Sequence, residues 1–180
     1  MNTTARQLVE NLLHFIESYG FVPNGGRVYY LTRSQPPLLS EMVMTVYSRS
    51  KTSSVLTSGN TSFLDFAGPL LEAEYQYFMD THAVQWDIPT TTEILNRYDA
   101  NTSLPRPESY IDDYDHAKQA GFEPFSAEAQ HLYHQIATAA ETGWDFSSRW
   151  LRNNAKFTSI QTDQVIPVEL NTILYRCEEW

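Results

Sequence analysis

Hydrophobic side chains recur every three or four positions along much of this 180-residue chain. This spacing is typical of amphipathic helices, and it is clearest in residues 126–140, where Ser126 is a natural N-cap. Gly20 and Gly121 each follow a helical run, a place where glycine commonly ends a helix. The pattern therefore predicts a mostly helical chain. The expected helices cover about residues 6–19, 38–47, 108–120 and 126–140, and a last helix begins near Pro167.

Three segments depart from this simple pattern. Residues 27–33 alternate between two faces, which predicts a short extended connection between helices, and the prolines that come after it fit the first turn of the next helix. Residues 62–80 are interpreted as a helix broken at Gly68-Pro69, because proline has no amide hydrogen. Residues 82–98 contain two alternating runs around a Pro/Thr-rich turn. They predict a small β-hairpin.

The composition is that of one globular domain with an acidic surface. The formal charge of −10 and the 12 scattered Lys and Arg residues argue against nucleic acid as a partner. A single cysteine, Cys177, excludes an internal disulfide and a cysteine-based metal site. No apolar run is long enough to span a bilayer, and the N-terminus lacks the apolar core of a signal peptide. Sequons at Asn2, Asn60 and Asn101 slightly favour a secreted protein.

Motifs for cofactor chemistry are missing from the sequence. It contains no P-loop, nucleotide fingerprint, serine nucleophile elbow or Cys/His pairing. The five histidines show no spacing that matches a known metal site. We therefore expect neither a cofactor nor a bound metal.

Polar and aromatic residues are instead concentrated in three joints between the predicted helices. The joints are PNGGRVYYLTRSQPP at 23–37, PRPESY at 105–110 and ETGWDFSSRW at 141–150. Each mixes arginine or asparagine with a carboxylate, an amide or an aromatic ring. This mixture suits a neutral polyhydroxylated ligand, because polar groups give directional hydrogen bonds and aromatic faces cover the C–H side of a sugar. Taken alone, each joint is more often an ordinary surface loop.

Asp145 is the candidate in these joints for a general acid. It follows the predicted end of helix 126–140, where the helix dipole disfavours a negative charge. Trp144 and Phe146 would remove part of its hydration, which also disfavours the charged form and makes the proton harder to remove. Arg149 would favour the charged form if it pairs with Asp145. Residue types alone favour the alternative that Asp145 caps the next turn and the tryptophans belong to the core.

Taken together and in this order, the three joints resemble the trehalase family of glycoside hydrolases. GFVPNGGRVYYLTRSQPP at 20–37, RPESY at 106–110 and ETGWDFSSRW at 141–150 are close to that family's own strings, and IPVELN at 166–171 fits the family's continuation beyond the third joint. The resemblance implies that residues 1–180 are a central fragment of a single trehalase catalytic domain. It implies a mostly α fold, part of an (α/α)6 toroid with a small β-hairpin.

The resemblance also implies an activity and a set of site residues. The activity is hydrolysis of the disaccharide α,α-trehalose to two glucoses with inversion at one anomeric carbon, without a cofactor, and Asp145 is the general acid. The implied substrate-binding residues are Asn24, Arg33, Ser34, Gln35, Arg106, Pro107, Glu108 and Gly143.

Part of the family pattern is not found in this sequence. An upstream Gly-Gly-Arg-Phe string and a downstream Gln-Trp-Asp-x-Pro segment, near which the general base lies, are not recovered; Gln85-Trp86-Asp87 precedes RPESY and is interpreted as hairpin sequence. An inverting glycosidase needs two carboxyl groups. The isolated chain is therefore expected to hold the acid without the base and to be inactive. The alternative is a non-catalytic sugar-binding or inert trehalase-like fragment.

Overall fold

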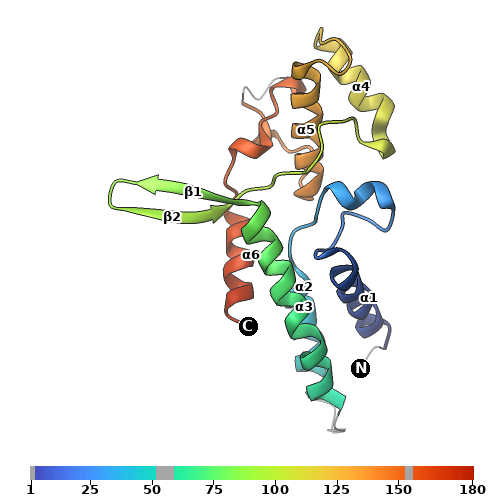
Figure 1. Ribbon diagram of the computed structural model, residues 1–180, viewed down its shortest axis with the longest axis vertical. Helices are drawn as coiled ribbons and strands as arrows, with labels where there is room; N and C mark the ends of the chain where they lie inside the picture. Colours follow the sequence, from blue (N-terminus) through green and yellow to red (C-terminus); the bar gives the residue numbers. More distant parts are fainter. Residues whose placement is uncertain (1–2, 52–58, 153–155) are drawn as a thin grey trace. The chain divides into compact units, whose positions relative to one another are not determined.

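The computed structural model describes residues 3–51, 59–152 and 156–180. The chain divides into two compact units, each built from segments that are distant in the sequence (Figure 1). The described residues are mostly helical, with one two-stranded hairpin, as the sequence predicts. The first unit comprises residues 1–22, 37–83 and 168–180, and the second comprises residues 23–36 and 84–167.

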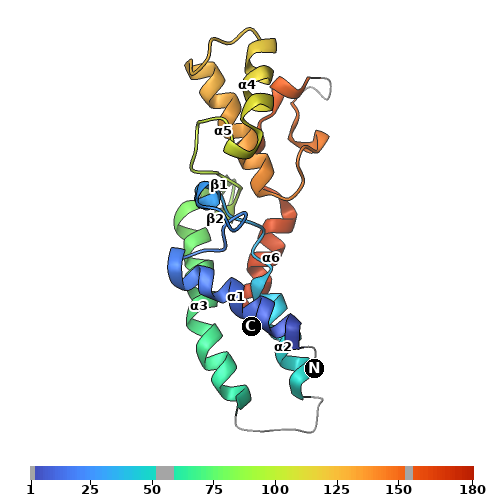
Figure 2. The same ribbon diagram turned by 90° about the vertical axis from the view of Figure 1, so that its right-hand side faces the viewer.

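Helices form the first unit. They are α1 (Thr3–Tyr19), α2 (Leu39–Lys51), α3 (Gly59–Thr81) and α6 (Val168–Glu178). Helices α1, α2 and α3 pack on one another, which Figures 1 and 2 show from two directions. Their shared core consists of Val9, Leu13, Ile16, Leu39, Val43, Val46, Phe63 and Ala67. Helix α1 confirms the helical spacing read from residues 6–19, and Gly20 ends it with a φ of 81°.

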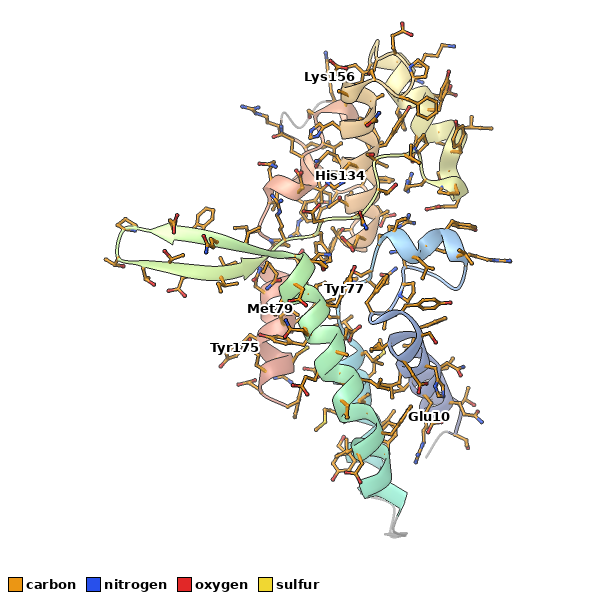
Figure 3. The ribbon with its side chains drawn as sticks, viewed as in Figure 1. Glu10, Tyr77, Met79, His134, Lys156 and Tyr175 are labelled. Atoms are coloured by element: carbon orange, nitrogen blue, oxygen red, sulfur yellow. The ribbon has the colours of Figure 1, made fainter. Side chains whose placement is uncertain are left out.

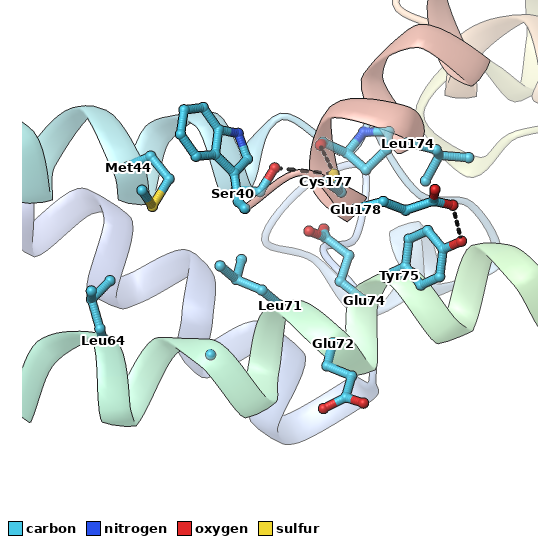
Figure 4. A pocket seen from close by; sticks show the side chains of 13 residues that line it. Ser40, Met44, Leu64, Leu71, Glu72, Glu74, Tyr75, Leu174, Cys177 and Glu178 are labelled. Carbon is cyan, nitrogen blue, oxygen red and sulfur yellow. Dashed lines mark hydrogen bonds between the residues drawn. The ribbon is translucent and has the colours of Figure 1, made fainter.

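A cavity of about 550 Å³ lies between α2, α3 and α6 in this unit (Figure 4). Its walls are mainly apolar, but the side chain of Glu74 projects into it, and Glu74 is only 4% exposed. Burial raises the pKa of Glu74 to about 7 and also raises the pKa of the Cys177 thiol. Cys177 lies 3.0 Å from the hydroxyl of Ser40. None of the predicted site residues lines this cavity.

The second unit is centred on α5 (Ala127–Glu141), which packs against α4 (Tyr110–Gln119). The side chain of Ser126 caps α5 by accepting a hydrogen bond from the amide of Ala129, as predicted. The hairpin consists of β1 (Ala83–Ile88) and β2 (Thr91–Asn96) (Figure 1). The core of this unit gathers Ala117, Ala129, Leu132, Tyr133, Ile136, Ala139, Trp150 and Ile160.

A cluster of charged groups ties the backbone of the second unit to α5. His134 projects from α5 (Figure 3), and its Nε2 lies 3.3 Å from Asp99 and 3.6 Å from Asp163. Hydrogen bonds with Asp163 and Asp99 raise the pKa of His134 to about 10. Arg97 donates to the carbonyl of Asp163 at 2.6 Å and to the carboxylate of Asp99 at 3.2 Å. The cluster fixes two loop segments against one face of the helix.

The predicted extended connection at residues 27–33 is wrong. Val28–Thr32 form a 3-10 helix, in which Tyr30 donates to the carbonyl of Arg27 at 2.9 Å. The two strands among the described residues pair with each other, so the alternating segment has no strand to join. Its backbone groups are satisfied locally instead.

The predicted break at Gly68-Pro69 is also wrong, because α3 runs through it. A proline disfavours helical geometry in the preceding residue chiefly by a clash with that residue's amide and Cβ. Gly68 has no Cβ, so that part of the clash with Pro69 is absent. Pro69 therefore removes one hydrogen bond without ending the helix. Pro36 and Pro37 differ from expectation as well, because they precede α2 and are not part of its first turn.

Two further sequence-based expectations concern location. Among the described helices none is long and apolar enough to cross a membrane. Of the three sequons, Asn101 is exposed, Asn60 falls in the first turn of α3, and Asn2 lies outside the described residues.

Candidate functional site

All nine predicted site residues belong to the second unit, where the three joints meet around the C-terminal end of α5. Asn24 anchors the first joint: its Nδ2 donates to the carbonyl of Ala140 at 3.2 Å and to that of Ser34 at 3.0 Å. Carbonyl groups in the last turn of a helix lack partners within the helix, and Asn24 satisfies one of them. Gln35 Nε2 in turn donates to the carbonyl of Asn24 at 3.2 Å.

Ser34 is buried on Glu141, a residue to which the sequence motifs assign no role. Its amide and its hydroxyl both donate to Glu141 Oε1 at 2.7 Å, and Glu141 Oε2 accepts from the amide of Asp99 at 3.0 Å. Glu141 is fully buried at the end of α5. A sequence signal for it exists, because Glu141 follows Ala137 and Ala140 on the apolar face of the helix.

Arg33 links the first joint to the second. Its guanidinium forms an ion pair with Glu108 and lies over the ring of Tyr30, with 5.0 Å between the guanidinium carbon and the ring centroid. Only 3% of Arg33 is exposed, so the pair is shielded from water on the arginine side. A charge-assisted contact of this kind holds both side chains in defined orientations.

Arg106 is fixed by Asp113, a second residue without a prior assignment. The amide and Nε of Arg106 donate to Asp113 Oδ2, each at 2.9 Å, and an Nη donates to Oδ1 at 2.7 Å. Burial works against the charged guanidinium, but the Asp113 carboxylate, helped by Glu108 and Asp145, holds the pKa of Arg106 above its usual value. Pro107 begins a 3-10 helix between the two partners. Because this turn is irregular, the pairing of Arg106 with Asp113 could not be predicted from helical periodicity.

The third joint follows α5 through a glycine. Gly143 has a φ of 70°, a conformation that favours glycine, and the amide of Trp144 then donates to the hydroxyl of Thr142 at 2.9 Å. Asp145 comes next, and its peptide bond with Phe146 is cis. The side chain of Asp145 is exposed to solvent.

The expectation that neighbouring rings desolvate Asp145 is wrong for the described residues. Asp145 is exposed, and so are Trp144 at 55% and Phe146 at 37%. The alternative interpretation is wrong in part as well, because Ser147 rather than Asp145 caps the 3-10 helix of residues 148–150. Trp150, in contrast, is 1% exposed and belongs to the core.

Arg149 lies against two indole rings, a contact that its place near Asp145 in the sequence does not predict. Its guanidinium carbon lies 5.1 Å from the ring centroids of both Trp144 and Trp150. The charge of Asp145 acts on Arg106, whose guanidinium also lies over the ring of Phe146 at 5.1 Å.

Asp145 and Arg106 line a polar hollow of about 490 Å³. The rings of Phe146 and Phe157 form its apolar part, and their centroids lie 5.2 Å apart, edge to face. A hollow that combines a carboxyl group, a guanidinium and aromatic faces can hydrogen-bond hydroxyl groups and deliver a proton to an oxygen atom. Within the described residues, there is no group of three or more His, Cys, Asp and Glu side chains that could hold a metal ion.

The contacts divide the predicted residues into two sets. Asn24, Ser34 and Gln35 bind one another or the end of α5. A second set forms a chain of charges in which Arg33 pairs with Glu108, and both Glu108 and Asp145 act on Arg106. Pro107 and Gly143 contribute backbone geometry rather than polar side chains.

A polar hollow with carboxyl groups, a guanidinium and aromatic rings is suited to a polyhydroxylated ligand, as expected of a glycoside hydrolase. Comparison with known proteins identifies the family of glycoside hydrolases to which this chain belongs. The sequence profile of the trehalase family matches residues 1–180. The chain belongs to the trehalase family, as the three joints predict.

Individual relatives agree with this assignment. The chain is 42% identical to a trehalase of Dictyostelium discoideum and 41% identical to a trehalase of Arabidopsis thaliana, each over 99% of its length. It covers 29% and 27% of these two proteins, so the chain spans under a third of the relatives that it matches. Neutral trehalase from Saccharomyces cerevisiae has a similar structure, with a TM-score of 0.71 and 25% identity over 97% of this chain and 32% of that one.

Proposed function

We propose that this chain is the acid-bearing segment of an α,α-trehalase, which hydrolyses trehalose to two glucoses with inversion. The observation that carries the proposal is the chain of charges from Arg33 through Glu108 and Arg106 to Asp145, in a member of the trehalase family. It places one exposed carboxyl group beside a buried guanidinium at the rim of a polar hollow.

Asp145 acts as the general acid in this proposal. Its carboxyl group donates a proton to the bridging oxygen as the bond between that oxygen and the anomeric carbon breaks, so the departing glucose leaves with a neutral hydroxyl group. Exposure of Asp145 leaves the carboxyl accessible to a sugar entering the hollow. The exposed rings of Trp144 and Phe146 offer apolar faces to the C–H surface of the disaccharide.

The arginines and Glu108 bind hydroxyl groups. Arg33 and Arg106 are held by carboxylates, so little side-chain freedom is left to lose when a hydroxyl group accepts a hydrogen bond from them. Asn24 and Ser34 already use their side-chain donors within the protein, and we assign them the role of holding this joint in place.

Inversion requires a second carboxylate that activates a water molecule on the opposite face of the sugar, about 6.5–9.5 Å from the acid. We propose that this base comes from polypeptide beyond these 180 residues, in the part of the family that the chain does not cover. The isolated chain is then expected to show no turnover of trehalose.

Replacing Asp145 by asparagine in the full-length enzyme tests the assignment. We expect kcat to fall by about 100- to 10,000-fold, with KM changed little, because proton donation is lost while sugar contacts remain. Asp112→Asn is the matched control, since Asp112 lines the same hollow and the substitution removes the same charge. Equal activity of Asp145→Asn and Asp112→Asn would disprove the role of Asp145. Calorimetric binding of trehalose by the full-length protein without turnover would favour the sugar-binding alternative.

A further inference from the structure

We propose that Glu141 is a positioning residue for this reaction: it holds the joint that carries Arg33 and Gln35 in a fixed place relative to Asp145. The inference rests on the proposed function and adds a residue to it. Glu141 is buried and does not line the hollow of Asp145 and Arg106, so we assign it a role through the groups that it binds.

The carboxylate of Glu141 connects three segments of the second unit. Oε1 accepts from the amide and the hydroxyl of Ser34, and Oε2 accepts from the amide of Asp99. Ser34 lies between Arg33 and Gln35, so fixing both its amide and its side chain fixes the backbone from which those two side chains project. These three neutral donors replace hydrogen bonds from water that the Glu141 carboxylate loses on burial.

The same residue is tied to the acid through the helix. Glu141 is the last residue of α5, and the chain reaches Asp145 four residues later through the turn at Gly143. The C-terminal end of α5 therefore anchors both Asp145 and the joint that carries Arg33 and Gln35. A joint that loses this anchor contacts the sugar less well, because its side chains must then be ordered on binding, while the acid keeps its place after the helix.

Other contacts keep this region folded when Glu141 is altered. Asn24 still bonds the carbonyl of Ala140, and Thr138 still accepts from the amide of Ala100 at 3.2 Å. Substituting Glu141 by glutamine keeps the shape but replaces one oxygen with an NH2 group, which must face an N–H or O–H donor of Ser34 or Asp99. That donor loses its acceptor, and the remaining hydrogen bonds lose the negative charge that strengthens them, so the joint is held less firmly in either orientation of the amide.

The test compares Glu141→Gln with Thr138→Val in the full-length enzyme. Thr138 is as buried as Glu141, and Thr138→Val removes a hydrogen bond from the same helix turn without touching Ser34. We expect Glu141→Gln to raise KM for trehalose by about 10-fold and to lower kcat by less than about threefold, because binding contacts are loosened while the acid stays in place. Thr138→Val is expected to lower Tm by a similar amount and to change KM less than about twofold. If the two variants change KM equally, Glu141 is merely structural and the proposal is overturned.

A double-mutant cycle with Ser34→Ala separates positioning from general loosening. If Glu141 acts through Ser34, the effects of the two substitutions on kcat/KM are not additive, and the second adds less than about twofold to the first. Additive effects contradict the proposal. Should Glu141→Gln fail to fold, Glu141→Asp keeps the charge but withdraws it by one methylene, and it is compared with Thr138→Val by the same criterion.

Failure of this inference can be told apart from failure of the proposed function. If Asp145→Asn retains activity, the proposed function fails whatever Glu141 does. If Asp145→Asn is inactive and Glu141→Gln matches Thr138→Val, only the positioning role fails. Amide hydrogen exchange at Ser34 and Asp99 reports the Glu141 contacts directly, and we expect both amides to exchange faster in Glu141→Gln than in Thr138→Val.

Discussion

Replacing Glu74 by glutamine removes an ionisable group from the cavity of the first unit, and it is expected to change how stability depends on pH. Glu74 is 4% exposed and forms no hydrogen bond or ion pair with another described residue. Burial alone raises its pKa from the ordinary 4.5 to about 7. That difference corresponds to about 3 kcal/mol, at about 1.4 kcal/mol for each pH unit.

The sign depends on which state binds the proton more tightly. Between pH 4.5 and about 7 the folded state keeps the proton on Glu74 while the unfolded state has lost it. The free energy of unfolding therefore falls as pH rises through this window, by about 3 kcal/mol in total, and the loss persists at higher pH. Glutamine cannot ionise, so the variant lacks this loss.

Urea denaturation at pH 4.5, 6 and 8 measures the effect as the difference between wild type and Glu74→Gln, in which the titration of all other groups cancels. We expect the variant to gain about 3 kcal/mol relative to wild type between pH 4.5 and 8. Glu72→Gln serves as the control, because Glu72 is exposed on the same helix. A Glu74→Gln difference that stays constant over the whole pH range would refute the reasoning, since it would show that Glu74 titrates alike in the folded and unfolded states.

Two further predictions concern paired charges in the second unit. His134→Gln should destabilise the protein by about 2 kcal/mol at pH 6, a value reduced for partial solvent exposure, because the stabilising imidazolium is fully present below its unfolded pKa near 6.5. This difference should disappear as pH rises through about 10, the pKa of His134 in the folded protein, and thermal denaturation at pH 6 and pH 10.5 measures it. Asp113→Asn should lower the free energy of unfolding by about 3 kcal/mol, because it leaves Arg106 buried without its bidentate partner. Asp112→Asn, an exposed neighbour in the same helix, should change it by less than about 0.5 kcal/mol in the same urea titration.

The helices could be predicted from the sequence because their signals are local. Ser126 caps α5 through a bond to a residue three positions away, and Gly121 ends α4 with a φ of 81°. Where the prediction failed, the outcome depended on something beyond periodicity. Residues 28–32 alternate like a strand, but the two strands in the described part of the chain pair with each other, and α3 continues through Pro69, which follows a residue without a Cβ.

In the candidate site, too, local sequence predicted the residues but not their contacts with residues far away in the sequence. Its residues could be named from three joints, but their contacts could not, since Glu141 meets Ser34 across 107 positions and Asp113 meets Arg106 across an irregular turn. The exposure of Asp145 was missed for a related reason. Aromatic neighbours in the sequence do not shield a carboxylate when their own side chains point into solvent.

The carboxylates of the second unit separate into structural and chemical groups by burial. Asp113 and Glu141 are fully buried; Asp113 accepts three hydrogen bonds from Arg106, and Glu141 accepts at least three from Ser34 and Asp99, in each case including one from a backbone amide. Burial keeps these two carboxylates out of contact with a ligand in solvent. Asp145 is the opposite case, exposed at the rim of a hollow beside a guanidinium that Asp113 has already fixed. Substitution of Asp113 or Glu141 should therefore change both the stability of the protein and the geometry of the site. Substitution of Asp145 should lower the rate of proton donation and leave the fold intact.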